Sequence, residues 1–334
     1  MKALVTGGAG FLGRGICRRL VERGDVVLSV SRGSYPELAD QGIEHHAMDL
    51  SSGEQALVPL LESVDVVFHC AARAGVFGPQ ESYLAPNVDG TQAVYSAARQ
   101  AKVRAFVHTS SPSACFDGQD HRRADDLPLA THFMSAYPAS KARAEKMLQR
   151  GLSDELPMTI LRPHLMFGPG DPHLIPRLIE KARRRKLIPI RPQQAPMEVS
   201  LTYIDNAVDA HLAAAQTLLE HGAQSPAHGR AYFIANSEPV DLWQWIEDLL
   251  QALDLPTPKR RISATSARIL GALLETLWKT LPLSGEPPLT PFVAAQLSTS
   301  HSYDMARAQK DLGFRESVSM AEATRRTIAH YLSQ

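Results

Sequence analysis

Tyr137 and Lys141 are four residues apart in the run Tyr-Pro-Ala-Ser-Lys. In a helix, residues at this spacing share one face, so the phenol and the ammonium would point to the same side. A free phenol has a pKa near 10 and is a poor acid–base catalyst at neutral pH unless nearby cations stabilise the phenolate. Lys141 would supply such a cation and could also anchor a ribose. We therefore expect Tyr137 and Lys141 to transfer a proton to or from an alcohol or ketone oxygen.

A third hydroxyl group is expected beside this pair. The run from His108 to Ala114 contains several serines and follows a strand-like apolar segment. Ser111 is the residue expected to hydrogen-bond the substrate oxygen, with Ser110 as the alternative. Serine clusters are also common in ordinary turns, so this assignment depends on the neighbouring Tyr137 and Lys141.

Glycines follow the first strand-like run of the chain, at the spacing of a dinucleotide-binding turn. Glycine allows a tight turn and the close approach of backbone N–H groups to a pyrophosphate, and the following helix adds partial positive charge. The residues expected to contact the pyrophosphate are Gly7, Gly10, Phe11, Leu12 and Gly13. The pattern predicts a nicotinamide dinucleotide as cofactor.

The end of the second strand should distinguish the two forms of that cofactor. An NAD site usually has a carboxylate there, whereas this chain has Ser31 and Arg32. A hydroxyl and a guanidinium suit a 2′-phosphate, so NADP(H) is favoured and NAD(H) is the alternative. The residues expected around the adenine and along the dinucleotide, at the ends of the third and fourth strands, are Asp49, Leu50, Ala71 and Ala72.

Short apolar runs, such as residues 105–109, alternate with helical patterns, such as residues 84–100, in the first half of the chain. This alternation predicts an α/β fold, a Rossmann-type doubly wound parallel sheet. After Arg162 prolines cluster and helical patterns dominate. We expect a dinucleotide-binding domain over residues 1–165 and a smaller, helix-rich substrate region over residues 166–334, with some segments such as Tyr232–Ala235 returning to the main sheet.

The composition excludes several classes of protein. The 334 residues carry 35 basic and 35 acidic side chains, so no global charge favours nucleic acid. Three scattered cysteines and thirteen histidines without metal-ligand spacing predict neither a disulfide framework nor a metal site. The N-terminus has no signal-peptide pattern, and a cytoplasmic location is expected.

Taken together, the motifs resemble the extended short-chain dehydrogenase/reductase family over nearly the whole chain. The matching pieces are Thr6–Gly13, Asn87–Thr91, Thr109–Ser111, Tyr137–Lys141, Leu161–Pro163 and Gly168–Asp171. The resemblance implies a Rossmann fold, catalysis by Tyr137 and Lys141, and a nicotinamide close to Pro163.

Within that family the chain looks most like the 3β-hydroxysteroid dehydrogenase branch, on the stretches Ala71–Gly78, Thr109–Gly118 and Leu201–Asn206. The first stretch looks closest to the ketoreductases of bacterial olefin synthesis, which reduce 2-alkyl-3-oxoalkanoates. Sterol 3-dehydrogenases are the second choice.

Two departures argue against the sugar-nucleotide branches. Epimerases have an asparagine where this chain has Leu165, and dehydratases have an Asp-Glu pair where it has Pro112 and Ser113. The resemblance therefore implies interconversion of a 3-keto and a 3-hydroxy group on a lipid-like substrate. The alternatives are an epimerase and a non-catalytic dinucleotide sensor.

The segment Ala267–Leu281 has leucines at helical spacing. We expect these to pack in the core, with a homodimer contact or a peripheral membrane contact as the alternative. The run Lys181–Lys186 is expected to be a solvated helix face rather than a patch for phosphate or acidic lipid.

Overall fold

The computed structural model describes residues 1–192, 194–281 and 283–334. Its main element is a seven-stranded sheet in the order β12-β7-β5-β4-β1-β2-β3, with all neighbouring strands parallel. The strands are β1 (Lys2–Thr6), β2 (Val26–Ser31), β3 (Ile43–Ala47), β4 (Val66–His69), β5 (Ala105–Thr109), β7 (Met158–Pro163) and β12 (Ala231–Ile234). Strand order reverses between β1 and β4, which is where parallel α/β sheets bind ligands. The predicted Rossmann fold is confirmed.

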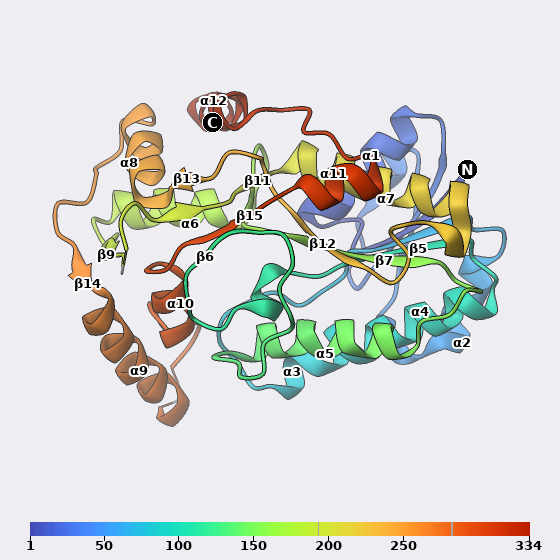
Figure 1. Ribbon diagram of the computed structural model, residues 1–334, viewed down its shortest axis with the longest axis horizontal. Coiled ribbons are helices and arrows are strands. Elements are labelled where there is room, and N and C mark those ends of the chain that lie inside the picture. Colours follow the sequence, from blue (N-terminus) through green and yellow to red (C-terminus); the bar gives the residue numbers. More distant parts are fainter. Residues whose placement is uncertain (193, 282) are drawn as a thin grey trace.

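Helices cover both faces of this sheet because its strands are apolar on both sides (Figure 1). Ala3 and Val5 pack into the core formed with α1 and α7, while Leu4 points into the opposite core with α4 and α5. The helices of the two layers are α1 (Phe11–Glu22) and α7 (Ile204–His221) on one side, and α2 (Glu54–Leu57), α4 (Gly90–Gln100) and α5 (Ala136–Arg150) on the other.

The helix expected over residues 84–100 is interrupted. A short α3 (Glu81–Leu84) continues into a wide turn, Ala85–Asp89, before α4 begins. Pro86 has no N–H to donate to the preceding turn, which accounts for the irregularity. The wide turn buries Asn87, a residue that matters for the site described below.

The C-terminal half adds helices and three small sheets. The helices are α6 (Leu174–Arg183), α8 (Leu242–Ala252), α9 (Ala264–Thr280), α10 (Pro291–Gln296), α11 (Ala306–Leu312) and α12 (Met320–Leu332). The first small sheet has four strands in the order β13 (Val240–Asp241), β10 (Glu198–Val199), β15 (His301–Tyr303) and β6 (His121–Ala124). The second pairs β11 (Thr202–Tyr203) with β8 (Met166–Phe167), and the third pairs β14 (Ile262–Ser263) with β9 (Ile190–Arg191).

The two halves exchange strands. β12 joins the main sheet beside β7, as expected for the segment around Tyr232, while β6 leaves the N-terminal half to pair with β15. A division of the chain at residue 165 remains a prediction.

The prediction that the leucines of α9 pack in the core is wrong for most of them. Leu270, Leu273, Leu277 and Leu281 are 42–66% exposed. Only a narrow face of the helix is buried, where Gly271 lies so close to α10 that an added Cβ would be 2.7 Å from the carbonyl carbon of Thr290. Among the described residues, no helix combines the length and apolarity needed to cross a bilayer.

Candidate active site

The loop between β1 and α1 has a conformation that requires glycine. Gly7 has a positive φ of 69°, and its N–H donates a 2.7 Å hydrogen bond to the Val30 carbonyl. A Cβ at Gly7 would lie 2.9 Å from the Cα of Ala71, and one at Gly13 would overlap the Gly7 carbonyl. No side chain caps the N-terminus of α1. Its first N–H groups are therefore available to an anion.

A cavity of about 600 Å³ lies beside this loop at the switch point of the sheet. It is lined by eight of the residues predicted to contact the dinucleotide, namely Gly7, Gly10, Ser31, Arg32, Asp49, Leu50, Ala71 and Ala72. Phe11 lines an adjoining cavity of about 610 Å³, whereas Leu12 and Gly13 are buried in α1. Pro163 ends the buried strand β7.

Tyr35 and Pro86 also line the cavity, although no sequence motif singled them out. Tyr35 lies in the irregular segment after β2, and Pro86 lies in the wide turn before α4. The segment around Tyr35 has no periodic pattern, and the helical pattern around Pro86 does not reveal the wide turn that brings this proline to the cavity. The cavity itself has the small residues and glycine backbone that a dinucleotide needs, so the residues present fit such a group.

Two side chains at the end of β2 lack a partner among the described residues. The Ser31 hydroxyl is buried without a hydrogen bond among the described residues, and no ion pair involving Arg32 is found there. Asp49 is already engaged, since it accepts hydrogen bonds from the N–H and hydroxyl of Ser51 at 2.9 and 2.7 Å. These bonds are the main reason why the pKa of Asp49 is lowered, and the charge of Arg32 adds to the effect.

Helix α5 places Tyr137 and Lys141 one turn apart, facing the end of β5. Lys141 is buried, and its Nζ donates a 2.7 Å hydrogen bond to the Thr109 carbonyl. Burial lowers the pKa of Lys141 to about 8. Burial also raises the pKa of Tyr137, and a hydrogen bond with Ser111 opposes that rise only in part. Burial therefore outweighs any lowering of the phenol pKa by the Lys141 ammonium, which is directed at the Thr109 carbonyl.

The structure separates the two candidate serines. Ser110 and Ser111 directly follow β5, where the backbone is still extended, so their side chains point to opposite sides. Ser111 lies next to the Tyr137 phenol and starts a short 3-10 turn, where it accepts hydrogen bonds from the N–H and hydroxyl of Ser113 at 3.2 and 2.9 Å. Ser110 is buried, and its hydroxyl has no partner among the described residues. Ser111 is therefore the hydroxyl that accompanies the pair.

Asn87 connects the cofactor cleft to the catalytic helix. Its side chain accepts from the Arg73 N–H at 2.6 Å and donates to the Arg73 carbonyl at 3.0 Å. It also donates to the Ser140 hydroxyl at 2.8 Å, which in turn donates to the Tyr137 carbonyl at 2.8 Å. This network fixes the loop after β4 relative to the backbone of Tyr137. The sequence marked Asn87 only as part of a motif.

Buried histidines lie behind the site. His69 stacks on His108 with ring centroids 5.4 Å apart, and His211 is hydrogen-bonded to the Thr109 hydroxyl at 2.9 Å. Both ring nitrogens of His108 lack a partner among the described residues. Burial lowers the pKa of His69 to about 3 and that of His211 to about 4, so these rings are neutral supports at physiological pH.

An apolar cluster follows Ser111. Phe116 and Phe292 pack edge to face with centroids 5.9 Å apart, and Val76 and Val293 pack against them. A cavity of about 400 Å³ lies between the loop Val76–Gln80, the residues around the start of α5, and the polar edge of α9. Apolar surface therefore lies near the start of α5, the helix that carries Tyr137.

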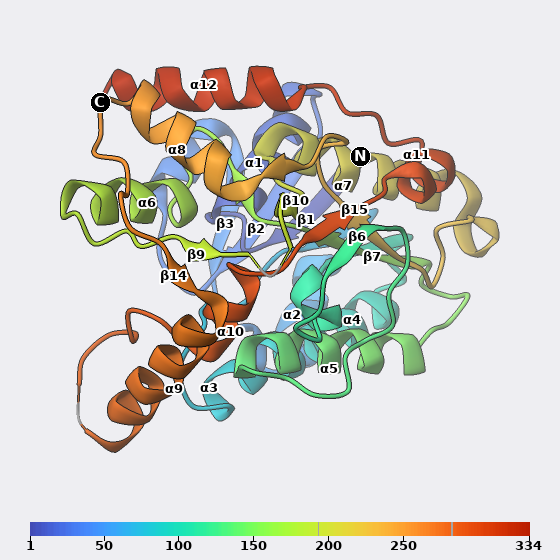
Figure 2. The same cartoon turned by 60° about the vertical axis from the view of Figure 1, so that its left-hand side comes forward.

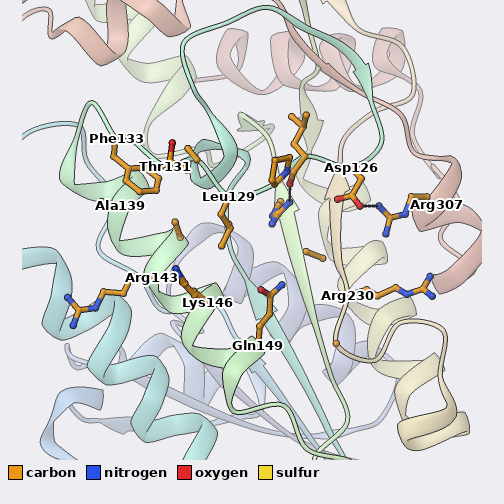
Figure 3. Close-up of a pocket in the computed structure, with 17 residues that line it drawn as sticks. Asp126, Leu129, Thr131, Phe133, Ala139, Arg143, Lys146, Gln149, Arg230 and Arg307 are labelled. Carbon is orange, nitrogen blue, oxygen red and sulfur yellow. Dashed lines mark hydrogen bonds and ion pairs between the residues drawn. The ribbon is translucent and has the colours of Figure 1, made fainter.

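A larger groove, of about 890 Å³, lies on the opposite face of α5 (Figure 3). It runs between Arg143, Lys146 and Gln149 on that helix and Arg230 and Arg307 on the far side. None of the predicted site residues lines it. The candidate site is therefore identified by its catalytic and cofactor-binding residues rather than by the volume of the cavity.

Arg162 is committed to a structural role. Its guanidinium is buried and binds the Glu145 carboxylate at 3.0 and 2.6 Å. Leu165 follows three residues later and has a positive φ of 39°. It occupies the sequence position at which epimerases were expected to have an asparagine. Among the described residues no three His, Cys, Asp or Glu side chains are grouped as metal ligands.

The site and fold were compared with known proteins. The 3-beta hydroxysteroid dehydrogenase/isomerase family matches residues 4–264. The chain is 41% identical over 329 residues to the 2-alkyl-3-oxoalkanoate reductase of Stenotrophomonas maltophilia, covering 98% of each chain. It is 32% identical to the decarboxylating sterol-4-alpha-carboxylate 3-dehydrogenase of Mus musculus, covering 99% of this chain and 91% of the relative.

Among solved structures, the UDP-glucuronic acid 4-epimerase from Bacillus cereus in complex with NAD has a TM-score of 0.73 at 21% identity, covering 100% of this chain and 99% of the other. This likeness concerns the fold. The sequence matches confirm the resemblance inferred from the motifs. The chain belongs to the 3-beta hydroxysteroid dehydrogenase/isomerase family, within the extended short-chain dehydrogenases/reductases, and is an oxidoreductase acting on CH–OH and C=O groups.

Proposed function

We propose that this protein is an NADP(H)-dependent reductase that converts the 3-keto group of a 2-alkyl-3-oxoalkanoate to a 3-hydroxy group. The observation that carries the proposal is the grouping of three side chains next to a glycine-lined cavity. Ser111 lies just after the carboxyl end of β5, and Tyr137 and the buried Lys141 lie near the start of α5. The relatives named 2-alkyl-3-oxoalkanoate reductase support this choice of substrate.

The three side chains have distinct roles in this proposal. Ser111 donates a hydrogen bond to the keto oxygen and so orients the substrate. Tyr137 gives its phenolic proton to that oxygen as the alcohol forms. Because burial raises the pKa of Tyr137, the phenol keeps its proton through neutral pH and is suited to act as the acid of a reduction. When bound, the reduced nicotinamide supplies the hydride that the keto carbon receives.

Lys141 acts as a positioning and electrostatic group. Its ammonium is held at the Thr109 carbonyl, where it would also reach the hydroxyl groups of a nicotinamide ribose. It thereby aligns the cofactor with Tyr137 and increases the positive potential at the reacting oxygen. Pro163, at the end of β7, would lie against the nicotinamide.

The preference for NADP(H) over NAD(H) is supported by the end of β2. The Ser31 hydroxyl, which has no partner among the described residues, and the Arg32 guanidinium are suited to a 2′-phosphate.

The substrate test is a chain-length series of 2-alkyl-3-oxoalkanoates, followed by NADPH absorbance. Each methylene buried against the apolar cluster of Val76, Phe116, Phe292 and Val293 should add about 0.8 kcal/mol, or roughly fourfold in kcat/KM. Activity that is indifferent to chain length would contradict the lipid pocket.

A 3β-hydroxysterol is the second candidate substrate, because the sterol dehydrogenases match 99% of the chain. The same assay with NADP⁺ and sterols decides between them.

A homodimer is also proposed, and light scattering on the purified protein tests it.

A further inference from the structure

One face of α9 is apolar and uncovered. The large side chains along it are 42–66% exposed, namely Ile269, Leu270, Leu273, Leu277 and Leu281. At about 100° per residue these positions fall within roughly 120° of the helix circumference, so they form a continuous stripe. Single exposed leucines are ordinary, but a contiguous stripe of this kind marks an interaction surface.

Two basic runs that are far apart in the sequence meet at the base of this helix. Arg183–Lys186 begins at the last residue of α6 and continues beyond it, and Lys259–Arg261 leads into β14. β9 and β14 pair in parallel, and the Ile262 N–H donates to the Pro189 carbonyl at 3.0 Å. This pairing brings both runs to the end of the molecule that carries α9 (Figures 1 and 2). We call these seven side chains the basic cluster.

Most of the basic cluster has no acidic partner. All seven side chains are exposed. In the described ranges, ion pairs are found only for Arg184, with Glu180 at 3.0 Å, and Arg261, with Glu247 at 2.7 Å. Because the whole chain has equal numbers of acidic and basic residues, this local excess is a property of the surface. Ile188 adds a half-exposed apolar side chain beside it.

We propose that α9 and the basic cluster form a docking surface for an anionic phospholipid bilayer. The aliphatic stripe enters the boundary between headgroups and acyl chains with the helix parallel to the membrane, and the unpaired cations contact lipid phosphates. A second copy is a poorer occupant, because a symmetric contact through this face brings two basic clusters together.

The docking surface is separate from the cavity beside α5. Glu275 and Lys279 line that cavity of about 400 Å³ together with Ser135 and Ala136 at the start of α5. At about 100° per residue, both side chains lie on the side of α9 away from the stripe, so docking leaves this cavity uncovered. The docking surface therefore does not rest on the proposed function.

Vesicle co-sedimentation of the full chain tests the surface. The probes are vesicles of phosphatidylcholine alone and of phosphatidylcholine mixed with phosphatidylglycerol. The wild type should bind the anionic vesicles at least tenfold more strongly. Arg185→Glu with Lys186→Glu should weaken that binding more than 25-fold, since each lost cation is worth about fivefold, or ~1 kcal/mol. Leu273→Asp with Leu277→Asp should weaken it at least tenfold.

Matched controls lie on other exposed surfaces. Leu332→Asp on α12 and Arg99→Glu on α4 change residues of the same types at exposed positions and should bind like the wild type. Circular dichroism checks that all variants fold. Equal binding by the wild type and the paired leucine variant overturns the proposal.

Light scattering distinguishes membrane docking from contact with a second copy of the chain. A wild-type dimer that becomes a monomer in the paired leucine variant, without vesicle binding by either, assigns the stripe to a second copy and rejects the membrane. No turnover is needed in these measurements, so a failure of the proposed function is distinguishable from a failure of docking.

Discussion

The Nζ of Lys141 donates a 2.7 Å hydrogen bond to the backbone carbonyl of Thr109, which fixes the ammonium at the end of the interior strand β5. The Thr109 hydroxyl in turn bonds His211 at 2.9 Å. The lysine is thereby held by backbone rather than by a carboxylate. Its charge stays available to the site, and burial alone is the main cause of its lowered pKa.

Replacing Tyr137 by Phe should lower kcat by roughly 10²–10⁴-fold, because it removes the transferable proton and keeps the ring. Cofactor affinity, measured by nicotinamide fluorescence, should change less than threefold. Tyr331→Phe is the matched control, since that phenol bonds the Asp171 carbonyl away from the site, and it should retain activity. Near-normal turnover in Tyr137→Phe would falsify the assignment.

The pH profile should report Lys141. Since burial lowers its pKa to about 8, the ammonium is charged below that pH and becomes neutral as pH rises through it. We expect kcat/KM to fall on the alkaline side with an apparent pKa near 8. Lys141→Arg, whose side chain stays charged, should lose this limb even if its activity is low. A limb that persists unchanged in Lys141→Arg would assign it to another group.

Arg32→Asp should weaken NADPH binding by roughly 10–150-fold, the equivalent of about 1.5–3 kcal/mol for one charge-assisted contact. NADH binding should be nearly unchanged, so the preference shifts towards NAD(H). The exposed Arg99, on α4, provides a charge-matched control as Arg99→Asp. Isothermal titration with both cofactors measures the effect, and identical affinities in parent and variant would contradict the role of Arg32.

Acid should destabilise the fold from about pH 6.5 downward. Burial depresses the pKa of His69, His108, His164 and His211, so these rings are neutral when folded and take up protons on unfolding. Their contribution to stability is complete above the unfolded pKa near 6.5 and is lost as the pH falls towards their folded values. Thermal melting between pH 8 and pH 5 should show a falling Tm.

His108→Leu should reduce that fall, because it removes one protonation site, and neither ring nitrogen has a partner among the described residues. The exposed His221→Gln is the control and should leave the slope unchanged. A Tm that is constant from pH 8 to pH 5 in the parent would refute the linkage.

Much of the sheet was predictable because its strands are short apolar runs bounded by turn residues. The segment 105–109 has the predicted bounds, whereas the helix expected at 84–100 contains the wide turn Ala85–Asp89 and begins earlier, at Glu81. Strand alternation distinguishes Ser111 from Ser110, but only once the register of β5 is known. The raised pKa of Tyr137 arises from tertiary burial, which no local pattern encodes.

The surface of α9 could not be predicted from the sequence. Its leucine spacing predicts an amphipathic helix but cannot tell what covers the apolar side. Likewise, the two basic runs look like separate solvated segments until the pairing of β9 with β14 joins them. Long-range pairing, rather than local propensity, decides both features.

The pairing of β6 with β15 has a consequence for biosynthesis. β6 is made early, but its partner leaves the ribosome only near the end of the chain, and β7 likewise waits for β12. A nascent or truncated chain of residues 1–165 therefore exposes two strands with unpaired backbone groups, which favour aggregation. The first half of this protein is expected to need chaperones or rapid completion of translation to reach its native state.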